Sequence, residues 1–160
     1  MAKSKKTTAT VVINKETRMS CDDWNQCCCI ISNYADQMNT EYFCNLNLAD
    51  KDLDDLKDHI VYTAKMGTRV VGFLVGSVDM FGGKVYAEAD WLFLDYDLHR
   101  NGVGGKLLNN FEEYVKNKRN AFGVGVKALK TARGFYEKKG YRASEEQDGK
   151  IFMNKHFDRR

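Results

Sequence analysis

The chain has 160 residues, of which 43% are hydrophobic and 29% are charged, and its formal net charge is +3. A chain of this length fits one hydrophobic core, and its composition excludes disordered and fibrous proteins. The charge is too small and too dispersed to predict nucleic-acid binding by itself. No stretch approaches the ~20 apolar residues of a membrane span. From the length we expect a single domain over residues 1–160.

The amino terminus, MAKSKKTTAT, is basic but lacks the apolar core and the cleavage site of a secretory signal. We therefore expect residues 1–6 to form a disordered tail and the protein to be cytoplasmic. The five cysteines include three in a row, from Cys27 to Cys29, a spacing that suits neither a disulfide framework nor tetrahedral zinc. They are interpreted as reduced, mostly buried thiols, and no metal site is predicted.

The first third of the chain is predicted to form a strand and two helices. Thr8 to Ile13 is rich in β-formers and predicts a strand. From Cys21 to Met38, apolar residues recur at steps of three and four, which is typical of an amphipathic helix. A second helix is predicted around Ala49 to Lys57, where Asp50 can cap the first amides and two leucines supply an apolar stripe.

Three strands are predicted next, at Ile60 to Met66, Arg69 to Asp79 and Lys84 to Asp95. They are separated by two short glycine-containing turns, the pattern of an antiparallel meander. Side chains alternate across a strand, so the third strand is expected to have two distinct faces. One face is predicted to carry Val85, Ala87, Ala89, Trp91 and Phe93. The other is predicted to carry Tyr86, Glu88, Asp90, Leu92 and Leu94, so that two carboxylates share it.

The last third alternates between helix and strand. A helix is predicted from Leu107 to about Lys118, a strand from Phe122 to Val126 and a further helix from Lys130 to Lys139, ended by Gly140. The segments near Tyr141 and Ile151 to Met153 are expected to close the sheet as a hairpin. The pattern as a whole predicts an α+β domain with a mixed sheet.

A glycine-rich turn stands between the third predicted strand of the meander and the helix that follows, in the segment Leu94 to Leu108. Glycine lets the backbone approach an anion closely, and the first helical amides have no partners within the helix. The helix dipole adds about half a positive charge at that end. A short glycine motif alone also fits a plain tight connection, but this context favours a diphosphate site.

This segment resembles the signature of the GNAT superfamily of acyl-CoA-dependent N-acetyltransferases, (Gln/Arg)-x-x-Gly-x-(Gly/Ala). Gly102 and Gly104 match it, whereas His99 stands where the family usually has Gln or Arg, and Arg100 could supply the charge instead. The family uses the helix after the signature to hold the pyrophosphate of coenzyme A. The resemblance therefore implies an acetyl-CoA site built from Leu94, Asp95, His99, Arg100, Asn101, Gly102, Val103, Gly104, Gly105 and Lys106.

A second segment, Ala132 to Tyr141, is similar to the family element A-x-x-x-Y-E-K-x-G-F on its last helix. Alone it would fit a core aromatic pair and a helix stop. Two family-like elements in the right order, across nearly the whole chain, imply the family's fold: one domain with a splayed, mixed central sheet of about six to seven strands and about four flanking helices. Leu129 stands where many members carry Asn, so that contact is missing or replaced.

The resemblance also assigns roles to single residues. Family members polarise the thioester carbonyl with a backbone amide of the splayed central strand, which by position belongs to Leu94 or Asp95. Tyr136 matches the family tyrosine that protonates the departing thiolate. Glu88 falls at the position of the catalytic glutamate of histone-type acetyltransferases, and Asp90 lies one step nearer the acyl group. Either carboxylate is a candidate general base, unless the two only bind a cationic substrate or are solvated.

These features predict direct transfer of an acetyl group from acetyl-CoA to a primary amine, with no metal and no covalent intermediate. The expected acceptor is a small molecule or a protein, and no membrane partner is expected. A homodimer is compatible with the sequence. One alternative is a toxin-like member acting on aminoacyl-tRNA, which would explain Lys127, Lys130 and Arg133. Another is a non-catalytic acyl-CoA-binding regulatory module. His59 and His156 are predicted to be surface residues.

Overall fold

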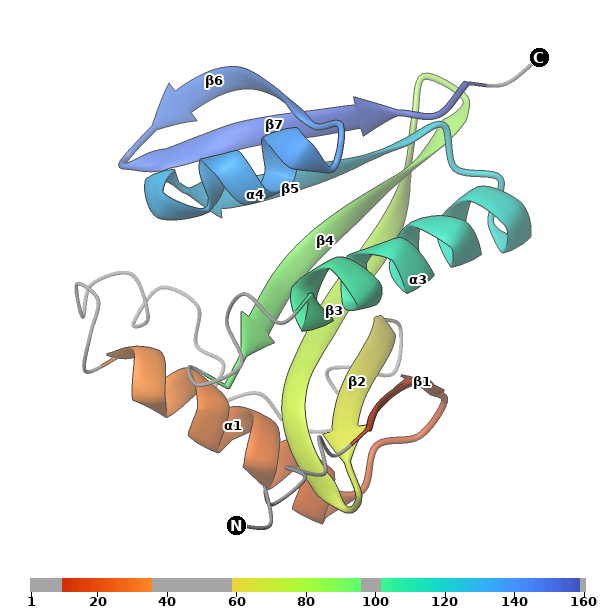
Figure 1. Cartoon of the computed structure of the whole chain (residues 1–160). Coiled ribbons are helices and arrows are strands. Elements are labelled where there is room, and N and C mark those ends of the chain that lie inside the picture. Colours follow the sequence, from red (N-terminus) through yellow and green to blue (C-terminus); the bar gives the residue numbers. More distant parts are fainter. Residues whose placement is uncertain (1–9, 36–58, 96–101, 159–160) are drawn as a thin grey trace, which may run out of the picture.

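The computed structural model describes residues 10–35, 59–95 and 102–158 (Figure 1). The expected tail at residues 1–6 and the predicted helix around Ala49 to Lys57 lie outside these ranges, as do His99, Arg100 and Asn101 of the predicted cofactor site. No helix among the described residues is both long and apolar enough to cross a membrane.

The described elements largely follow the sequence prediction. The strand Ile60–Met66 is confirmed at both ends, whereas the first strand begins at Val11 and extends beyond its predicted end to Glu16. The predicted helix from Lys130 is a 3-10 turn that leads into a shorter α-helix. In chain order the elements are β1 (Val11–Glu16), α1 (Cys21–Ala35), β2 (Ile60–Met66), β3 (Arg69–Phe81), β4 (Lys84–Leu94), α3 (Val103–Lys118), β5 (Gly123–Leu129), η4 (Lys130–Ala132), α4 (Arg133–Lys138), β6 (Arg142–Gln147) and β7 (Lys150–His156).

Local chemistry accounts for several element boundaries. The side chain of Ser20 accepts a hydrogen bond of 3.1 Å from the amide of Asp23, which caps the start of α1. Gly82 and Gly83 have φ values of +59° and +77°, the left-handed conformation that a tight hairpin turn between β3 and β4 requires. These two signals lie within a few residues of the boundaries they set, so the sequence alone could place them.

The seven strands form one mixed sheet in the order β1-β2-β3-β4-β5-β7-β6. All neighbours are antiparallel except β4 and β5, which run parallel. The β4–β5 pairing is short and ends at the pair Ala89 and Val126. Beyond it the two strands diverge and open a V in the middle of the sheet (Figure 1). The predicted α+β fold with a splayed mixed sheet is confirmed.

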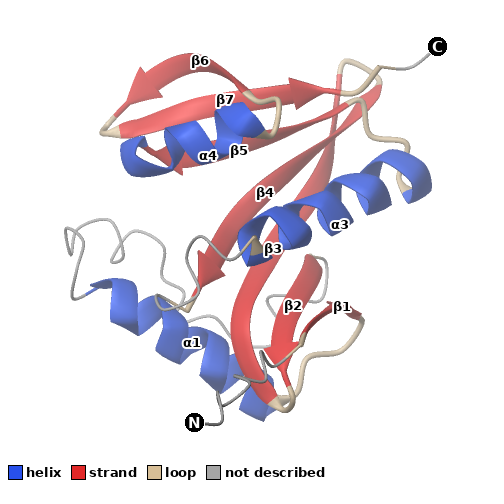
Figure 2. Cartoon of the chain, in the orientation of Figure 1, coloured by secondary structure: helices blue, strands red, loops and turns tan. Residues whose placement is uncertain are grey.

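Helices cover both faces of the sheet (Figure 2). On one face, Leu107, Leu108 and Phe111 of α3 are fully buried against the sheet, and α4 packs on the same side. On the other face, α1 buries Trp24 and Cys27 in a second, smaller cluster near the lower halves of β2 to β4. Apolar burial of this kind is worth roughly 25 cal/mol per Å² and holds the layers together.

The predicted alternation of side chains along β4 is broken by a β-bulge at Asp90. Val75 of β3 pairs with Trp91 and Gly76 pairs with Ala89, which leaves Asp90 as the extra residue. The prediction of one continuous face is therefore wrong from Trp91 onward. The β4 side chains on the α3 side are Val85, Ala87, Ala89, Leu92 and Leu94. Those on the α1 side include Trp91 and Phe93.

Candidate active site

Glu88 and Asp90 lie together on the sheet face opposite α3, beside the point where β4 and β5 part. Their side chains hydrogen bond to each other, and the hydroxyl of Ser77 donates a 2.8 Å hydrogen bond to Asp90. The bulge keeps both carboxylates on one face, because the extra residue is Asp90 itself. The expectation that the two carboxylates share a face therefore agrees with the structure.

The surroundings of this pair favour proton uptake. Partial burial raises the pKa of Glu88, and the negative charge of Asp90 raises it further. Partial burial also raises the pKa of Asp90, although the hydrogen bond from Ser77 acts in the opposite direction. The shared hydrogen bond raises the pKa of Glu88 and lowers that of Asp90. Glu88 is thus the better proton acceptor of the two.

His59 belongs to the same cluster, contrary to the prediction of an ordinary surface residue. Its ring stacks on Trp91 with centroids 6.3 Å apart and an interplanar angle of 10°. Its Nδ1 atom is buried and has no hydrogen-bond partner among the described residues. Ile60 pairs with Gly76, so His59 stands beside Ser77 in the sheet, and its charge lowers the pKa of Asp90. Only the strand register reveals this position.

The first turn of α3 has the properties of an anion site. Gly102 precedes the helix with φ +76°, a left-handed conformation that favours glycine, and no side chain of the described residues caps the helix. The first internal helical bond runs from the amide of Lys106 to the carbonyl of Gly102 at 3.1 Å. The amides of Val103, Gly104 and Gly105 therefore have no acceptor within the helix, and no acidic residue lies in the first turn.

The two further glycines let neighbouring groups approach this turn. A Cβ atom on Gly104 would lie 3.3 Å from Leu94 and 3.6 Å from the ring of Phe135, so glycine allows α3 to pack against the end of β4 and against α4. A Cβ atom on Gly105 would lie 2.6 Å from the ammonium of Lys139. This lysine, which the sequence prediction missed, adds a positive charge beside the free amides.

The backbone amides along the end of β4 divide between two directions. The amide of Asp95 donates to the carbonyl of Val71 at 2.7 Å, so it faces β3 and is not available to a thioester. The prediction that the amide of Asp95 polarises the thioester carbonyl is therefore corrected. The carboxylate of Asp95 pairs with Arg69. Because amides alternate along a strand, those of Leu94 and Leu92 face the side from which β5 has diverged. That the amide of Leu94 polarises the thioester carbonyl stays a prediction, and the amide of Leu92 is a further candidate for this role.

Tyr136 lies on the side of the sheet opposite the carboxylate pair. It is 8% exposed and belongs to the core cluster beneath α3 and α4. Its ring meets those of Phe135 and Tyr141 edge-on, with centroid distances of 5.0 and 5.5 Å. Phe135 in turn approaches Gly104, so α4 stands next to the first turn of α3. The V of the sheet therefore has Tyr136 on one side and Glu88 on the other.

Comparison with known proteins agrees with this geometry. The acetyltransferase (GNAT) domain family matches residues 32–151. A search of curated protein sequences gives no match. The PaiA N-acetyltransferase of Thermoplasma acidophilum, solved with coenzyme A, is 16% identical with a TM-score of 0.72 and covers 92% of this chain and 99% of its own. An aminoglycoside 6′-N-acetyltransferase complexed with coenzyme A is 16% identical with a TM-score of 0.74, covering 93% and 98%.

The fold and the site therefore define an acetyltransferase. The family match extends over most of the chain, and the chain belongs to the GNAT acetyltransferase family. The family predicted from the two sequence motifs is confirmed.

Proposed function

We propose that the protein transfers an acetyl group from acetyl-CoA to a primary amine by direct attack. Acetyl-CoA supplies the activated thioester. The observation that carries the proposal is the arrangement around the V of the sheet: an uncapped, cationic helix terminus and Tyr136 lie on one side, and the pair of Glu88 and Asp90 lies on the other. Coenzyme A in two solved relatives supports the choice of cofactor.

The residues at the start of α3 fit the diphosphate of this cofactor. The amides of Val103, Gly104 and Gly105 would donate to its oxygens, because they have no acceptor in the helix. The ammonium of Lys139 would add a charge-assisted contact, and the side chain of Lys106 is exposed on the same turn. The amide of Leu92 or Leu94 would meet the acyl arm where β4 has parted from β5.

Glu88 is the proposed general base and Asp90 its positioning partner. The attacking amine must lose a proton, and a carboxylate with a raised pKa accepts it more readily than an ordinary one. Asp90 is held by Ser77 and in turn holds Glu88, so its negative charge favours the protonated form of Glu88. After attack, the hydroxyl of Tyr136 would donate a proton to the departing thiolate.

The test is acetyl-CoA turnover measured by thiol release against a panel of primary amines. We expect amine-dependent release in the wild-type protein and a large loss in Glu88→Gln. The matched control is Glu113→Gln, an exposed carboxylate on α3 on the opposite face of the sheet. Tight coenzyme A binding without turnover on any amine would contradict the proposal and favour the regulatory-module alternative.

The aminoacyl-tRNA alternative receives little support from the charge arrangement. Lys130 pairs with Glu146 at 2.5 Å and Arg133 pairs with Glu137 at 2.6 Å, so two of the three cations that suggested it each have an acidic neighbour on the surface. The third, Lys127, lies over the ring of Phe152 at 5.2 Å. A phosphate-binding surface needs clustered, available cations. A small molecule or a protein amine is the better acceptor class.

We also propose a cytoplasmic location, supported by the cysteines. Cys21, Cys27, Cys28 and Cys29 are free thiols. Burial raises the pKa of Cys27, which keeps this thiol protonated and unreactive. Reduced thiols are characteristic of cytosolic proteins.

A further inference from the structure

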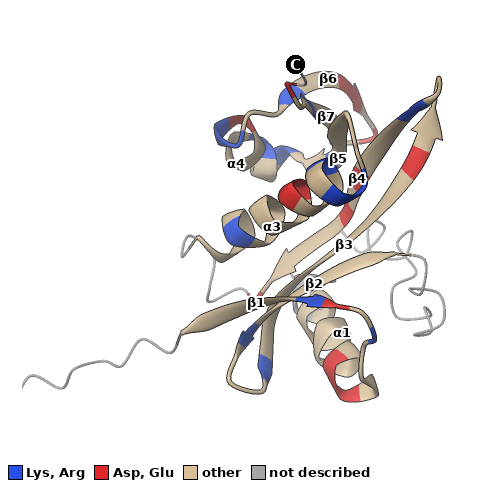
Figure 3. Cartoon of the chain, turned by 90° about the vertical axis from the view of Figure 1, so that its right-hand side faces the viewer, with Lys and Arg blue, Asp and Glu red and all other residues tan. Residues whose placement is uncertain are grey.

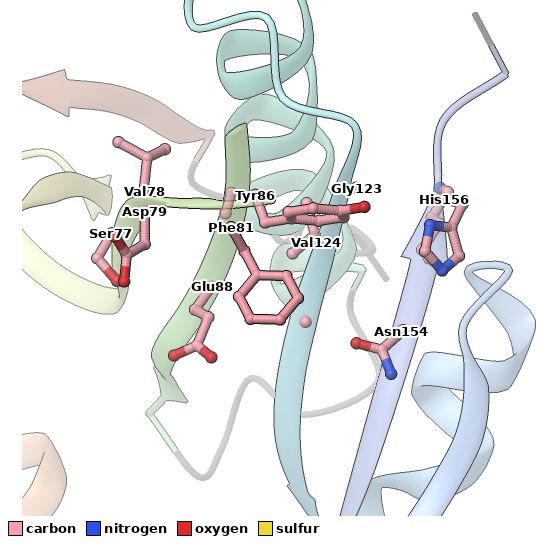
Figure 4. A pocket seen from close by; sticks show the side chains of 13 residues that line it. Ser77, Val78, Asp79, Phe81, Tyr86, Glu88, Gly123, Val124, Asn154 and His156 are labelled. Atoms are coloured by element: carbon pink, nitrogen blue, oxygen red, sulfur yellow. The ribbon is translucent and has the colours of Figure 1, made fainter. Parts of the chain in front are cut away.

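A trough lies on the sheet face opposite α3, between the β3–β4 hairpin and β7 (Figure 4). Its volume is about 670 Å³, which is the size of a small-molecule site. Gly123 and Gly125 of β5 form its floor, and Glu88, the proposed base, reaches into it. The trough therefore joins the reacting centre and extends from it along the sheet.

The floor is open because β5 alternates glycine and valine. Val124 and Val126 fill the core on the α3 side, whereas the glycines at 123 and 125 leave the other face without side chains. A Cβ atom on Gly123 would lie 2.5 Å from the carbonyl oxygen of Lys155, so glycine at this position lets the backbone of β7 approach closely. One on Gly125 would lie 3.2 Å from the side chain of Asn154. The alternation keeps a channel between β4 and β7.

Aromatic side chains line the hairpin wall of the trough. Phe81 is 80% exposed and points toward Glu88 (Figure 4). Tyr86 is held in place by the ring of Phe122 at 6.4 Å and by the edge of His156 at 6.5 Å. An exposed aromatic ring beside a cavity is typical of a binding surface, and aromatic faces attract ammonium groups. This wall suits the hydrocarbon chain of a cationic ligand.

The charges that line the trough are negative. Asp79 and Glu88 contribute two carboxylates. Lys155 also lines it, but its ammonium binds Glu112 at 2.9 Å. Lys127, whose charge lowers the pKa of Glu88, does not belong to the lining, and the ammonium of Lys84 lies over the ring of Phe122 at 5.0 Å. Acidic segments are visible on β3 and β4 in Figure 3. A ligand with positive charge therefore complements the site.

The sheet register fixes the separation of the two carboxylates. Ser77 pairs with Glu88 and Asp79 pairs with Tyr86, so Asp79 and Glu88 are diagonal neighbours across β3 and β4. The Cα atoms of diagonal neighbours lie roughly 7–8 Å apart, so one small ligand can reach both side chains. We propose that the trough binds the body of the acceptor, and that the acceptor is a small amine with a second ammonium group about 7 Å from the amino group that is acetylated.

This inference rests on the proposed acetyltransferase function and names the substrate class for the same site. The reacting amino group lies at Glu88, the second ammonium at Asp79, and the chain between them along Phe81 and Tyr86. A monoamine of equal length would fill the trough but leave Asp79 without its partner.

The first experiment compares pentane-1,5-diamine with pentylamine as acceptors at saturating acetyl-CoA. We expect kcat/KM to be about tenfold higher for the diamine, and Asp79→Asn to bring the ratio of the two values close to one. Asp22→Asn makes the same chemical change at an exposed position in the first turn of α1, and should leave the ratio unchanged. A wild-type ratio near one, or a ratio that Asp79→Asn does not alter, would overturn the inference and leave the proposed function standing.

The second experiment measures binding of the diamine by calorimetry, without acetyl-CoA. We expect weaker binding in Asp79→Asn and in Gly125→Val, whose side chain would occupy the trough, with folding checked by circular dichroism. Diamine binding that depends on Asp79, without turnover of any amine, would support the trough and contradict the proposed function. Absence of both diamine binding and amine turnover would overturn both the inference about the trough and the proposed function.

Discussion

Glu88 and Asp90 illustrate how two identical charges come to differ in function. Both are exposed on one face of β4 but lose part of their hydration to neighbouring groups, which raises the pKa of each. Ser77 donates to Asp90 and favours its charged form, whereas the charge of Asp90 favours the protonated form of Glu88. A pair whose proton affinities are separated in this way suits one acceptor and one positioning group.

The pH dependence of turnover tests this assignment. The base works only when deprotonated, so kcat/KM should fall as the pH decreases through the raised pKa of Glu88. Asp90→Asn removes a charge that raises this pKa, so the acidic limb of the profile should move to lower pH. Glu88→Gln should lower kcat by ~10²- to 10⁴-fold. An acidic limb that stays in place in Asp90→Asn would show that the two carboxylates do not act as a pair.

Tyr136→Phe tests the proposed general acid. We expect turnover to fall by ~10²- to 10⁴-fold, while acetyl-CoA affinity and thermal stability stay nearly unchanged, because the ring contacts with Phe135 and Tyr141 are kept. Tyr114→Phe on α3 is the matched control, and it should retain activity. Near-normal turnover in Tyr136→Phe would mean that water protonates the leaving group.

At the scale of elements, the start of α3 combines three features that a phosphate site needs. Its first amides are uncapped, its glycines allow close packing against Leu94 and Phe135, and Lys139 from the end of α4 lies against Gly105. A cation beside the positive end of a helix dipole is unfavourable by itself. The proposed diphosphate between them would offset this cost.

Gly104→Val should disturb this packing. The new Cβ atom would lie 3.3 Å from Leu94, and the two methyl groups would push α3 away from β4. We expect calorimetry to show at least a roughly tenfold loss of acetyl-CoA affinity with the fold retained by circular dichroism. Gly134→Val, at an α4 position where a Cβ atom meets nothing within 4 Å, is the control. Unchanged affinity in Gly104→Val would remove this turn from the site.

Lys139→Gln should weaken acetyl-CoA binding by about 5- to 10-fold, because one charge-assisted contact to the diphosphate is lost. The difference from wild type should shrink as salt concentration rises, since salt screens the charge. The neighbouring exposed Lys138 offers the control Lys138→Gln. Equal effects of the two substitutions would indicate a general electrostatic contribution and no specific contact.

At the scale of the whole molecule, a buried polar network ties the β5-β7-β6 half of the V-shaped sheet to α3. Tyr141 donates a 2.8 Å hydrogen bond to Glu112 of α3, which also binds Lys155 of β7 at 2.9 Å. Glu112 is 7% exposed and Tyr141 2% exposed. Buried carboxylates need such partners, because an unsatisfied polar group is costly in a low-dielectric interior.

Tyr141→Phe should therefore lower the free energy of unfolding by about 1–3 kcal/mol, since Glu112 loses one donor. Urea unfolding would measure this as a lower midpoint with an unchanged slope. In the control Tyr114→Phe, at a half-buried position on α3, we expect a loss of less than about 0.5 kcal/mol. Equal stability of the two variants would mean that solvent replaces the lost hydroxyl.

Much of this architecture could be predicted from the sequence, because its signals are local. The β-forming residues of β2 and the glycines of the β3–β4 turn act through neighbours a few residues away. The glycine signature before α3 and the tyrosine element of α4 together indicated the family, which the match over residues 32–151 confirms.

The remaining features depend on groups far apart in the chain, and only the tertiary structure decided them. The bulge at Asp90 depends on how β4 pairs with β3, and it moves Trp91 and Phe93 to the opposite face. His59 enters the site through the register of β2, and Lys139 through the packing of α4 on α3. Local patterns fix which residues form an element, but the registers and packing between elements fix which side chains meet.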